Sequence, residues 1–525
     1  MAAWSNGYVA DIPYTYGFFR RMAPAQLRLA ALTCGHGAPP TDRVAYAELG
    51  CGQGFGTVLL AAANPDADIY GFDFNPEQVA HAQRLGDKAG LSNLHLRDLS
   101  FEELAELPLA DLPEFDMVTL HGVYSWISPH ARAAVTTFLR RKLKPGGLVY
   151  ISYNAMPGCA AVQPLQRLVR AEAARAPGTS DARARAGVAF AARLAEKGFA
   201  FLKDSPSVMR RLGHHENQSG AYLAHEYLNA DWTLFYLEDV ATELDAAKLV
   251  FVGSGRLAEN DLRLSVPAEL QEFFRGIEDP IRRETLKDYW ANRSFRVDVF
   301  QKGSTRPGRE DLIVATRAQR VSLRKPADAV DLTFPVGSGK MEGRREVFEP
   351  LLDRLSAGPA TIGELEVAAR GRADLPTLLR MIILLDATDQ LGAARLASPD
   401  PEPARRLNQV LAQSWNGPYR FVAAPELGGA LEASSDDLLL LGLVLAGVEA
   451  SGEALAMAAF ERLTAMRKVV RGDDSAATDH AAQMGILRER AGRFVDAVLP
   501  VWRNAGIVGR EVQSGTAAPR LTAVG

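Results

Sequence analysis

The amino-acid sequence predicts an α/β protein in which a parallel sheet precedes a mainly helical C-terminal region. Two observations favour this fold class. Between residues 44 and 155, short apolar runs alternate with helical patterns, which is typical of a parallel sheet with helices on both faces. After residue 327, most periodic segments repeat as helices do. With 525 residues, the chain is long enough for several domains.

Short apolar runs predict seven strands of one sheet. The expected strands are Val44–Leu49, Ile69–Phe72, Leu94–Leu96, Met117–Leu120, Leu148–Tyr153, Leu249–Gly253 and Phe295–Gln301. The last two are expected to form the final hairpin of that sheet. Helices are expected after Gly54, Asn75 and Ser128. Asn75 and Ser128 can each cap a helix, and the proline that follows each is tolerated at the first helical position.

The rest of the chain is expected to be largely helical. Helical insertions are expected between Val162 and Ala247 and between Leu257 and Arg293. A linker is expected at Arg324–Asp328. Three short helices and a strand then follow in winged-helix order, at Val347–Leu355, Thr361–Ala369, Leu375–Leu385 and Leu391–Leu396. Later helical patterns lie at Leu438–Val448, Ala454–Val469 and Met484–Trp502.

These patterns divide the chain into six expected parts. They are an N-terminal arm (1–43), the core (44–158), a helical region that includes the last strands (159–323), a winged-helix-like domain (327–400), a helical C-terminal domain (404–513) and a flexible tail (514–525). Pro399 to Pro403 marks the second boundary after the linker.

Composition excludes several classes of protein. The net charge of −4 argues against a general nucleic-acid coat, and acids outnumber bases between Glu346 and Arg395, in the winged-helix-like stretch. The few, widely spaced cysteines predict no disulfide framework. The N-terminus has no secretory signal. The longest apolar run, Leu438–Val448, is too short to cross a bilayer. A cytoplasmic protein without membrane insertion is expected.

A glycine-rich turn follows the first expected strand. Its sequence is Glu48-Leu49-Gly50-Cys51-Gly52-Gln53-Gly54. In a parallel sheet, nucleotide cofactors bind at the carboxyl ends of the strands, where the strand order reverses. Glycine lets ligand atoms approach the backbone closely and adopts unusual φ and ψ at little cost. The N–H groups of the following helix point toward such a ligand. The turn therefore predicts a nucleotide-cofactor site.

Acidic residues end the second and third expected strands. Asp73 can accept hydrogen bonds from both hydroxyls of a ribose, and Asp98 can meet an adenine amino group with Leu99 beside the ring. Dehydrogenases that use NAD also place an acid at the first position, but their turn prefers G-x-G-x-x-G, whereas this one is G-x-G-x-G after Glu48. Lys144-Pro145-Gly146-Gly147 is expected to be a helix-ending turn before the fifth strand.

As a set, these features resemble class I S-adenosylmethionine-dependent methyltransferases over Val44–Ala155. The resemblance implies a Rossmann-like α/β sheet with helical insertions, followed by mainly helical, winged-helix-like C-terminal domains. It also implies S-adenosylmethionine as the cofactor. The cofactor-binding residues that it implies are Tyr16, Glu48, Gly50, Gly52, Gly54, Asp73, Phe74, Asp98, Leu99, His121 and Gly122. Tyr14 and Tyr16 of the N-terminal arm are expected to cap the cofactor.

Flanking segments resemble a subset of this family, bacterial enzymes that carry a methyltransferase regulatory domain. The segments are Tyr14–Phe19, Ala23–Arg28, His121–Trp126, Ser152–Gly158, His225–Leu228 and Asn292–Phe300. Rickettsial members methylate lysines of an outer-membrane protein, so the resemblance implies an amine acceptor. One departure is Cys159, where the subset has Trp after Pro-Gly; this puts the identity of the substrate in doubt.

Four residues after the fourth and fifth strands are candidates for the acceptor side of the site: Tyr124, Trp126, Tyr153 and Asn154. Methyl transfer needs alignment and exclusion of water more than acid–base help. Aromatic walls also suit the stem and cation of lysine. Trp126 and Tyr153 could equally be packing residues. His214, His215, Glu216, His225 and Glu226 fit no common zinc spacing, and no metal is expected.

Three functions remain open from the sequence. They are methylation of a protein at lysine, methylation of a small metabolite, and a non-catalytic regulator that binds S-adenosylmethionine. A protein substrate and a homodimer are the expected partners, and nucleic acid is not. The region after Pro326 is expected to serve the acceptor or the dimer and not the cofactor. A chain ending near Leu323, if it folds, is then expected to keep its cofactor affinity and to lose methyl transfer.

Overall fold

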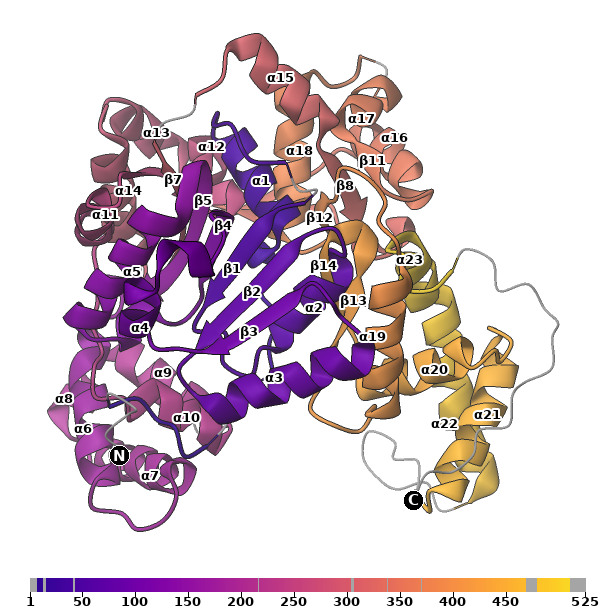
Figure 1. Cartoon of the computed structure of the whole chain (residues 1–525), viewed down its shortest axis with the longest axis horizontal. Helices are drawn as coiled ribbons and strands as arrows, with labels where there is room; N and C mark the ends of the chain where they lie inside the picture. The colour runs from indigo at the N-terminus through magenta and orange to yellow at the C-terminus, as the bar shows by residue number, and fades with distance from the viewer. Residues whose placement is uncertain are drawn as a thin grey trace.

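The computed structural model describes residues 7–12, 16–40, 43–215, 217–303, 306–337, 339–369, 371–468 and 479–509. A seven-stranded sheet with the order β3-β2-β1-β4-β5-β7-β6 lies at its centre (Figure 1). The strands are β1 (Ala45–Leu49), β2 (Asp68–Asp73), β3 (Leu94–Asp98), β4 (Phe115–Leu120), β5 (Leu143–Asn154), β6 (Leu249–Ser254) and β7 (Phe295–Lys302). The sequence predicts all seven. The first five are parallel, and β7 runs antiparallel to β5 and β6.

The strand order reverses between β1 and β4, which pair with each other in parallel. At such a point the two neighbouring loops leave the sheet in opposite directions and open a crevice. The expected helix-ending turn at Lys144–Gly147 is instead part of β5. The strand register shifts there, from Phe115 opposite Leu143 to Met117 opposite Leu148, so these residues form an irregular start of the strand.

Helices cover both faces of the sheet. One face packs against α1 (Pro24–Thr33), α2 (Phe55–Ala63) and α3 (Pro76–Ala89). The other packs against α4 (Phe101–Glu106), α5 (Pro129–Lys142) and α11 (Leu237–Asp245). The caps expected from the sequence are present, since the Asn75 side chain accepts the N–H of Glu77 and the Ser128 hydroxyl accepts the N–H of Ala131.

Both expected helical insertions are present. The first contains α6 (Gln163–Ala173), α7 (Ser180–Glu196), α8 (Ala200–Lys203), α9 (Pro206–His215) and α10 (Gly220–Tyr227). These helices form an apolar core of their own, which also includes Val9 of the N-terminal arm. The second insertion contains α12 (Leu262–Ser265), α13 (Ala268–Arg275) and α14 (Pro280–Ala291).

The region after β7 begins with α15 (Arg309–Ala318) and a three-stranded sheet of the order β11-β8-β12. Its strands are β8 (Arg320–Leu323), β11 (Ala360–Thr361) and β12 (Leu391–Ala394), and its helices are α16 (Arg345–Ser356), α17 (Ile362–Ala368) and α18 (Leu375–Ala387). The three helices and β12 lie where the winged-helix order predicts them. The expected linker at Arg324–Asp328 does not separate two domains, because β8 before it pairs with β11 and β12 after it.

The remaining elements complete a helical C-terminal part that contains two hairpins. They are the strand pairs β9 (Thr333–Val336) with β10 (Gly339–Glu342) and β13 (Phe421–Ala424) with β14 (Gly429–Glu432), and the helices α19 (Glu402–Gln413), α20 (Ser435–Leu445), α21 (Gly452–Ala465), α22 (His480–Arg493) and α23 (Leu499–Asn504). The sequence predicts neither hairpin. The expected tail, 514–525, lies outside the described residues. Within the described ranges, every helix is too short or too polar to span a bilayer.

Candidate active site

A cavity of about 470 Å³ lies at the carboxyl ends of β1, β2 and β4, at the point where the strand order reverses. Its lining combines the glycine-rich turn with residues from the ends of these strands. Nine of the predicted cofactor residues line it: Glu48, Gly50, Gly52, Gly54, Asp73, Phe74, Leu99, His121 and Gly122. The tertiary structure therefore brings together side chains that lie up to 74 positions apart in the chain.

The glycines of the turn have different structural roles. All three have positive φ, and a Cβ at Gly54 would lie 2.4 Å from Ala82 Cβ, so a side chain there would collide with α3. At Gly52 a Cβ would meet only Gln78 Oε1, at 3.4 Å, and at Gly122 it would meet no atom within 4 Å. Both residues line the cavity. The space that a side chain would fill at Gly52 and Gly122 is thus left open for a ligand.

Two buried carboxylates stand beside the turn. The Thr57 hydroxyl donates to Glu48 at 2.6 Å, and the backbone N–H groups of Gly52 and Asn75 donate to Asp73 at 2.8 and 3.0 Å. Burial raises the pKa of Glu48 to about 7 and that of Asp73 to about 6. Each Asp73 oxygen retains acceptor capacity, so the carboxylate can still take hydrogen bonds from a ligand.

His121 forms the wall of the cavity at the end of β4. Its Nδ1 atom lies 2.8 Å from the Tyr150 hydroxyl oxygen and 3.2 Å from Ser152 Oγ, and its ring stacks on Phe19 with 3.6 Å between the centroids. Burial, with the nearby charges of Arg21 and Arg256, lowers the pKa of His121 to about 3. The imidazole is therefore neutral at physiological pH, which suits a wall next to a cationic cofactor.

Two predicted cofactor residues lie outside the cavity lining. Asp98 is exposed at the end of β3, and the residues that reach the cavity from this loop are Leu99, Ser100 and Phe101. Tyr16 packs against Phe55 and Tyr419. Neither side chain reaches the cavity lining directly in this structure. Tyr14 lies outside the described residues.

The four acceptor candidates divide into two pairs. Trp126 and Asn154 line the cavity. Tyr124 and Tyr153 do not, because both are buried in the core. Their hydroxyls donate to internal carboxylates, Tyr124 to Glu243 and Tyr153 to Asp298, the latter at 2.5 Å. Both side chains therefore pack within the fold and do not line the cavity.

Several further residues line the cavity, and among them only His225 and Glu226 are candidates from the sequence, as possible metal ligands. Tyr8 comes from the N-terminal arm, Phe19 precedes α1, Phe295 begins β7, and Tyr222, His225 and Glu226 belong to α10. Tyr8 contacts both Phe74 and His225, with ring centroids 5.8 and 5.6 Å apart, and so connects the two sides of the cavity. The flanking segments around Phe19, His225 and Phe295 signalled a subset of proteins, but their spacing could not place them at one cavity.

The candidate metal residues are dispersed over the first insertion. His214 lies beside Gln218, His215 Nδ1 lies 2.7 Å from the Tyr227 hydroxyl oxygen, and Glu226 pairs with Arg211 at 3.0 Å. Glu216 is not among the described residues. In the part of the chain that the structure describes, no three His, Cys, Asp or Glu side chains come together as a metal site.

Comparison with known proteins agrees with this fold. A family described as "Methyltransferase domain" matches residues 41–186, and one described as "Predicted methyltransferase regulatory domain" matches residues 219–302. The sheet order, the glycine-rich turn and these matches define a class I methyltransferase that uses S-adenosylmethionine.

Similar proteins match over most of the chain. The uncharacterized protein sll1526 of Synechocystis is 33% identical over 450 residues, which is 83% of this chain and 87% of that protein. The uncharacterized protein RP789 of Rickettsia prowazekii is 25% identical over 346 residues, 62% of this chain and 60% of that protein. The structure of PKMT2 from Rickettsia typhi in complex with AdoHcy matches with a TM-score of 0.69 and 18% identity, covering 92% of this chain and 99% of that one. The chain belongs to the family of methyltransferases that carry this regulatory domain.

Proposed function

We propose that this chain transfers the methyl group of S-adenosylmethionine to an amine, namely the side chain of lysine in a protein. The observation that carries the proposal is the composition of the cavity, in which the cofactor turn and a second, largely aromatic wall face the same space. The resemblance to rickettsial enzymes that methylate lysine supports the same acceptor.

The chain's own residues fit the cofactor. Gly52 and Gly122 leave backbone accessible to its methionine part, Asp73 is placed to accept the ribose hydroxyls, and Leu99 and Phe101 offer apolar contact to adenine. The cofactor supplies a methyl group already activated on a sulfonium. The protein therefore has to bind, align and keep out water, and the N-terminal arm and α10 contribute to the walls that can do this.

The acceptor wall suits a lysine side chain. Tyr8, Trp126, Tyr222 and Phe295 supply aromatic surface for the alkyl stem. The Asn154 side-chain amide has no hydrogen-bond partner among the described residues, so it is available to orient an amine. A lysine must lose a proton before transfer, and an apolar environment promotes this loss because it disfavours the charged form.

The acceptor test uses S-adenosylmethionine with a tritiated methyl group and a bacterial lysate. We expect label in protein bands, stable to mild base and recovered as methyl-lysine after hydrolysis. The rate is expected to rise from about pH 6 to about pH 9, because deprotonation of the amine becomes easier. Base-labile label would indicate a carboxylate acceptor, and label confined to small molecules would indicate a metabolite; either result contradicts the proposal.

Two variants separate the cofactor site from the acceptor site. Gly52→Val fills the space over the turn and should abolish binding of S-adenosylhomocysteine. Asp73→Ala should weaken it roughly tenfold to hundredfold, which corresponds to about 1.5–3 kcal/mol for hydrogen bonds to a charged acceptor. Asn154→Ala is the matched control, since it should keep that affinity and slow methyl transfer. Unchanged calorimetric binding in both of the first two variants would refute the site.

A further inference from the structure

A second cavity, of about 410 Å³, lies beside the first one. Phe18, Phe19, His121 and Phe295 line both, so the stacked rings of Phe19 and His121 form part of the wall between them. The second cavity lies between the sheet and the C-terminal region. The rest of its lining is Arg20, Arg21, Tyr150, Arg256, Val297, Arg324, Ala387, Asp389, Phe421 and Glu432. Its volume is typical of a site for a small molecule.

Four arginines face this cavity, and two of them are paired within the fold. Arg20 contacts Asp386 and also Asp389, the latter at 2.7 Å, and Arg324 contacts Asp389 at 3.1 Å. The remaining carboxylate of the lining, Glu432, is exposed. The charges of Arg20 and Arg324 are thus balanced by Asp386 and Asp389.

The charges of Arg21 and Arg256 are less well balanced by carboxylates of the fold. The Nε atom of Arg21 is buried and has no hydrogen-bond partner in the described part of the chain. Arg256 reaches only Glu259, at 3.4 Å, and Glu259 is already bound by Arg293. Burial and repulsion by Arg20 and Arg256 lower the pKa of Arg21. A buried donor without a partner is costly, and Arg256, which is partly exposed, shares Glu259 with Arg293. An anion in the cavity would therefore add a partner for both arginines.

We propose that this second cavity binds a small molecule that carries carboxylate or phosphate groups, with Arg21 and Arg256 as its ligands. A guanidinium presents parallel N–H donors that match the two oxygens of a carboxylate or phosphate. A cavity of about 410 Å³ favours a small anion over a polymer. Because Phe19 and His121 are shared with the first cavity, a bound anion would lie directly behind one wall of the cofactor site.

Calorimetry on the full-length protein tests this, with citrate and inorganic phosphate as separate probes at constant ionic strength. We expect saturable binding of at least one probe, at least tenfold weaker in Arg21→Gln and in Arg256→Gln. Arg488→Gln removes an exposed arginine that pairs with Glu453 outside the lining, and it should bind like the unmodified protein. The tighter probe decides between a carboxylate and a phosphate ligand.

The binding of S-adenosylhomocysteine is measured in the same variants and reports whether the cofactor site is still folded. The proposal rests on the arginines and not on the acceptor, so it stands even if lysine is not methylated. It is overturned if neither probe binds saturably, or if Arg488→Gln weakens binding as much as Arg21→Gln and Arg256→Gln do.

Discussion

Helix α5 on one face of the central sheet has an exposed side, whereas helix α2 on the opposite face has none. In α5, Ala133, Thr137 and Arg140 are exposed along one stripe, and Val135, Phe138 and Leu139 are buried on the other side. In α2, every residue except Gly56 is buried, and α1 is almost as fully enclosed. A helix that is apolar all round must be covered on both sides.

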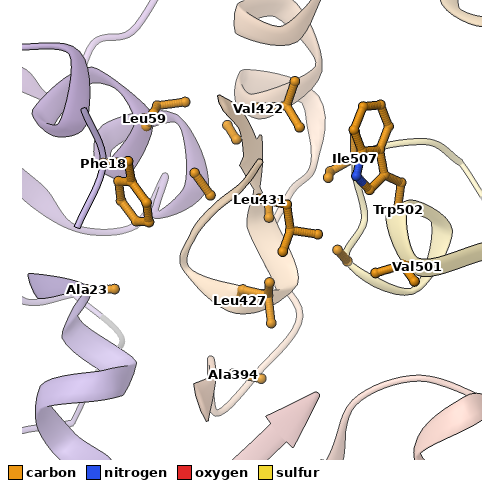
Figure 2. Packing of buried hydrophobic residues seen from close by; sticks show 14 of the residues in the cluster. Phe18, Ala23, Leu59, Ala394, Val422, Leu427, Leu431, Val501, Trp502 and Ile507 are labelled. Atoms are coloured by element: carbon orange, nitrogen blue, oxygen red, sulfur yellow. The ribbon is translucent and has the colours of Figure 1, made fainter. Parts of the chain in front are cut away.

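The second cover of α2 is the C-terminal region. Figure 2 shows Leu59 of α2 and Val422 of β13 in one cluster of buried apolar side chains, and α2 contacts β13, β14 and α19. Polar contacts fix the same interface, where Asn64 donates to the Gly428 carbonyl at 3.0 Å and Arg395 pairs with Asp66 at 2.8 Å. One apolar core therefore runs from the sheet through α1 and α2 into residues as distant as Val508.

This difference between the faces changes the role of the C-terminal region. From the sequence, residues after Pro326 are expected to serve an acceptor or a dimer and to be dispensable for the cofactor. The structure makes them a layer of the fold, since α19 also packs beside α3 (Figure 1) and Arg406 donates to the Ala89 carbonyl at 2.8 Å. The cofactor turn lies between strand β1 and this doubly covered helix α2.

Removal of the layer should have the largest effect. A chain that ends at Leu323 exposes the outer sides of α1 and α2, an apolar surface beyond what soluble monomers tolerate. We expect it to aggregate and to bind no S-adenosylhomocysteine, as measured by size-exclusion chromatography and calorimetry. Full-length Gly52→Val is the control, because it loses the cofactor but should remain monodisperse. A truncated chain that is monodisperse and binds with full affinity would contradict this prediction, because α1 and α2 would then need no second cover.

A matched pair of substitutions sharpens the comparison. Leu59→Asp places a charge on the outer side of α2, where an ordinary surface helix would accept it. Here the charge is buried without a partner, and we expect a loss of stability on the order of 4 kcal/mol. Ala133→Asp puts the same charge on the exposed stripe of α5, with an expected change within about 0.5 kcal/mol. Denaturant melts measure both. Equal changes in the two variants would contradict the second layer.

The pKa of Glu48 reports how well water is excluded beside α2, because Glu48 accepts a hydrogen bond from Thr57 of that helix. Its pKa is raised from 4.5 to about 7, so the native state holds this proton more tightly than the unfolded state. Protonated Glu48 therefore makes its full contribution to stability below about pH 4.5, and this contribution is lost as the pH rises through 7. Glu48→Gln should raise the free energy of unfolding at pH 8 by at most about 3 kcal/mol, and by little at pH 5.

Thermal melts of the cofactor-free protein at the two pH values measure this effect. The glutamine oxygen can still accept the Thr57 hydrogen bond, so the comparison isolates the charge. If Glu48→Gln changed the free energy of unfolding equally at pH 5 and pH 8, water would reach Glu48 and would not be excluded from the covered side.

Much of the cofactor side could be predicted because it depends on local sequence. The turn from Gly50 to Gly54 and the acid Asp73 occupy fixed positions relative to buried strands, and strand ends of a parallel sheet meet at one edge. Asp98 shows that a position at a strand end does not by itself determine the exposure of a side chain. Its position in the strand is as expected, but the chain leaves β3 so that Leu99 faces the cavity and Asp98 faces solvent.

The acceptor side and the second cavity could not be predicted in this way. Tyr124 and Trp126 are two residues apart in one short turn, and only the packing of α11 decides that Tyr124 binds Glu243 while Trp126 lines the cavity. Tyr8, Tyr222 and Phe295 come from three separate parts of the chain. The arginines of the second cavity come from the segment before α1, the loop after β6 and the residue after β8, and no periodicity connects them.

The sequence by itself determined the seven strands, their capped helices and the glycine turn with its carboxylate, because each depends on neighbours a few residues away. The tertiary structure alone decided which face of the sheet is covered twice, which aromatic side chains reach the cavity and where Arg21 and Arg256 meet. These depend on contacts between segments hundreds of residues apart, such as Gln26 with Asp386 at 2.8 Å. Such contacts depend on which surfaces are buried and how their shapes fit together, and the local pattern of residues does not specify either.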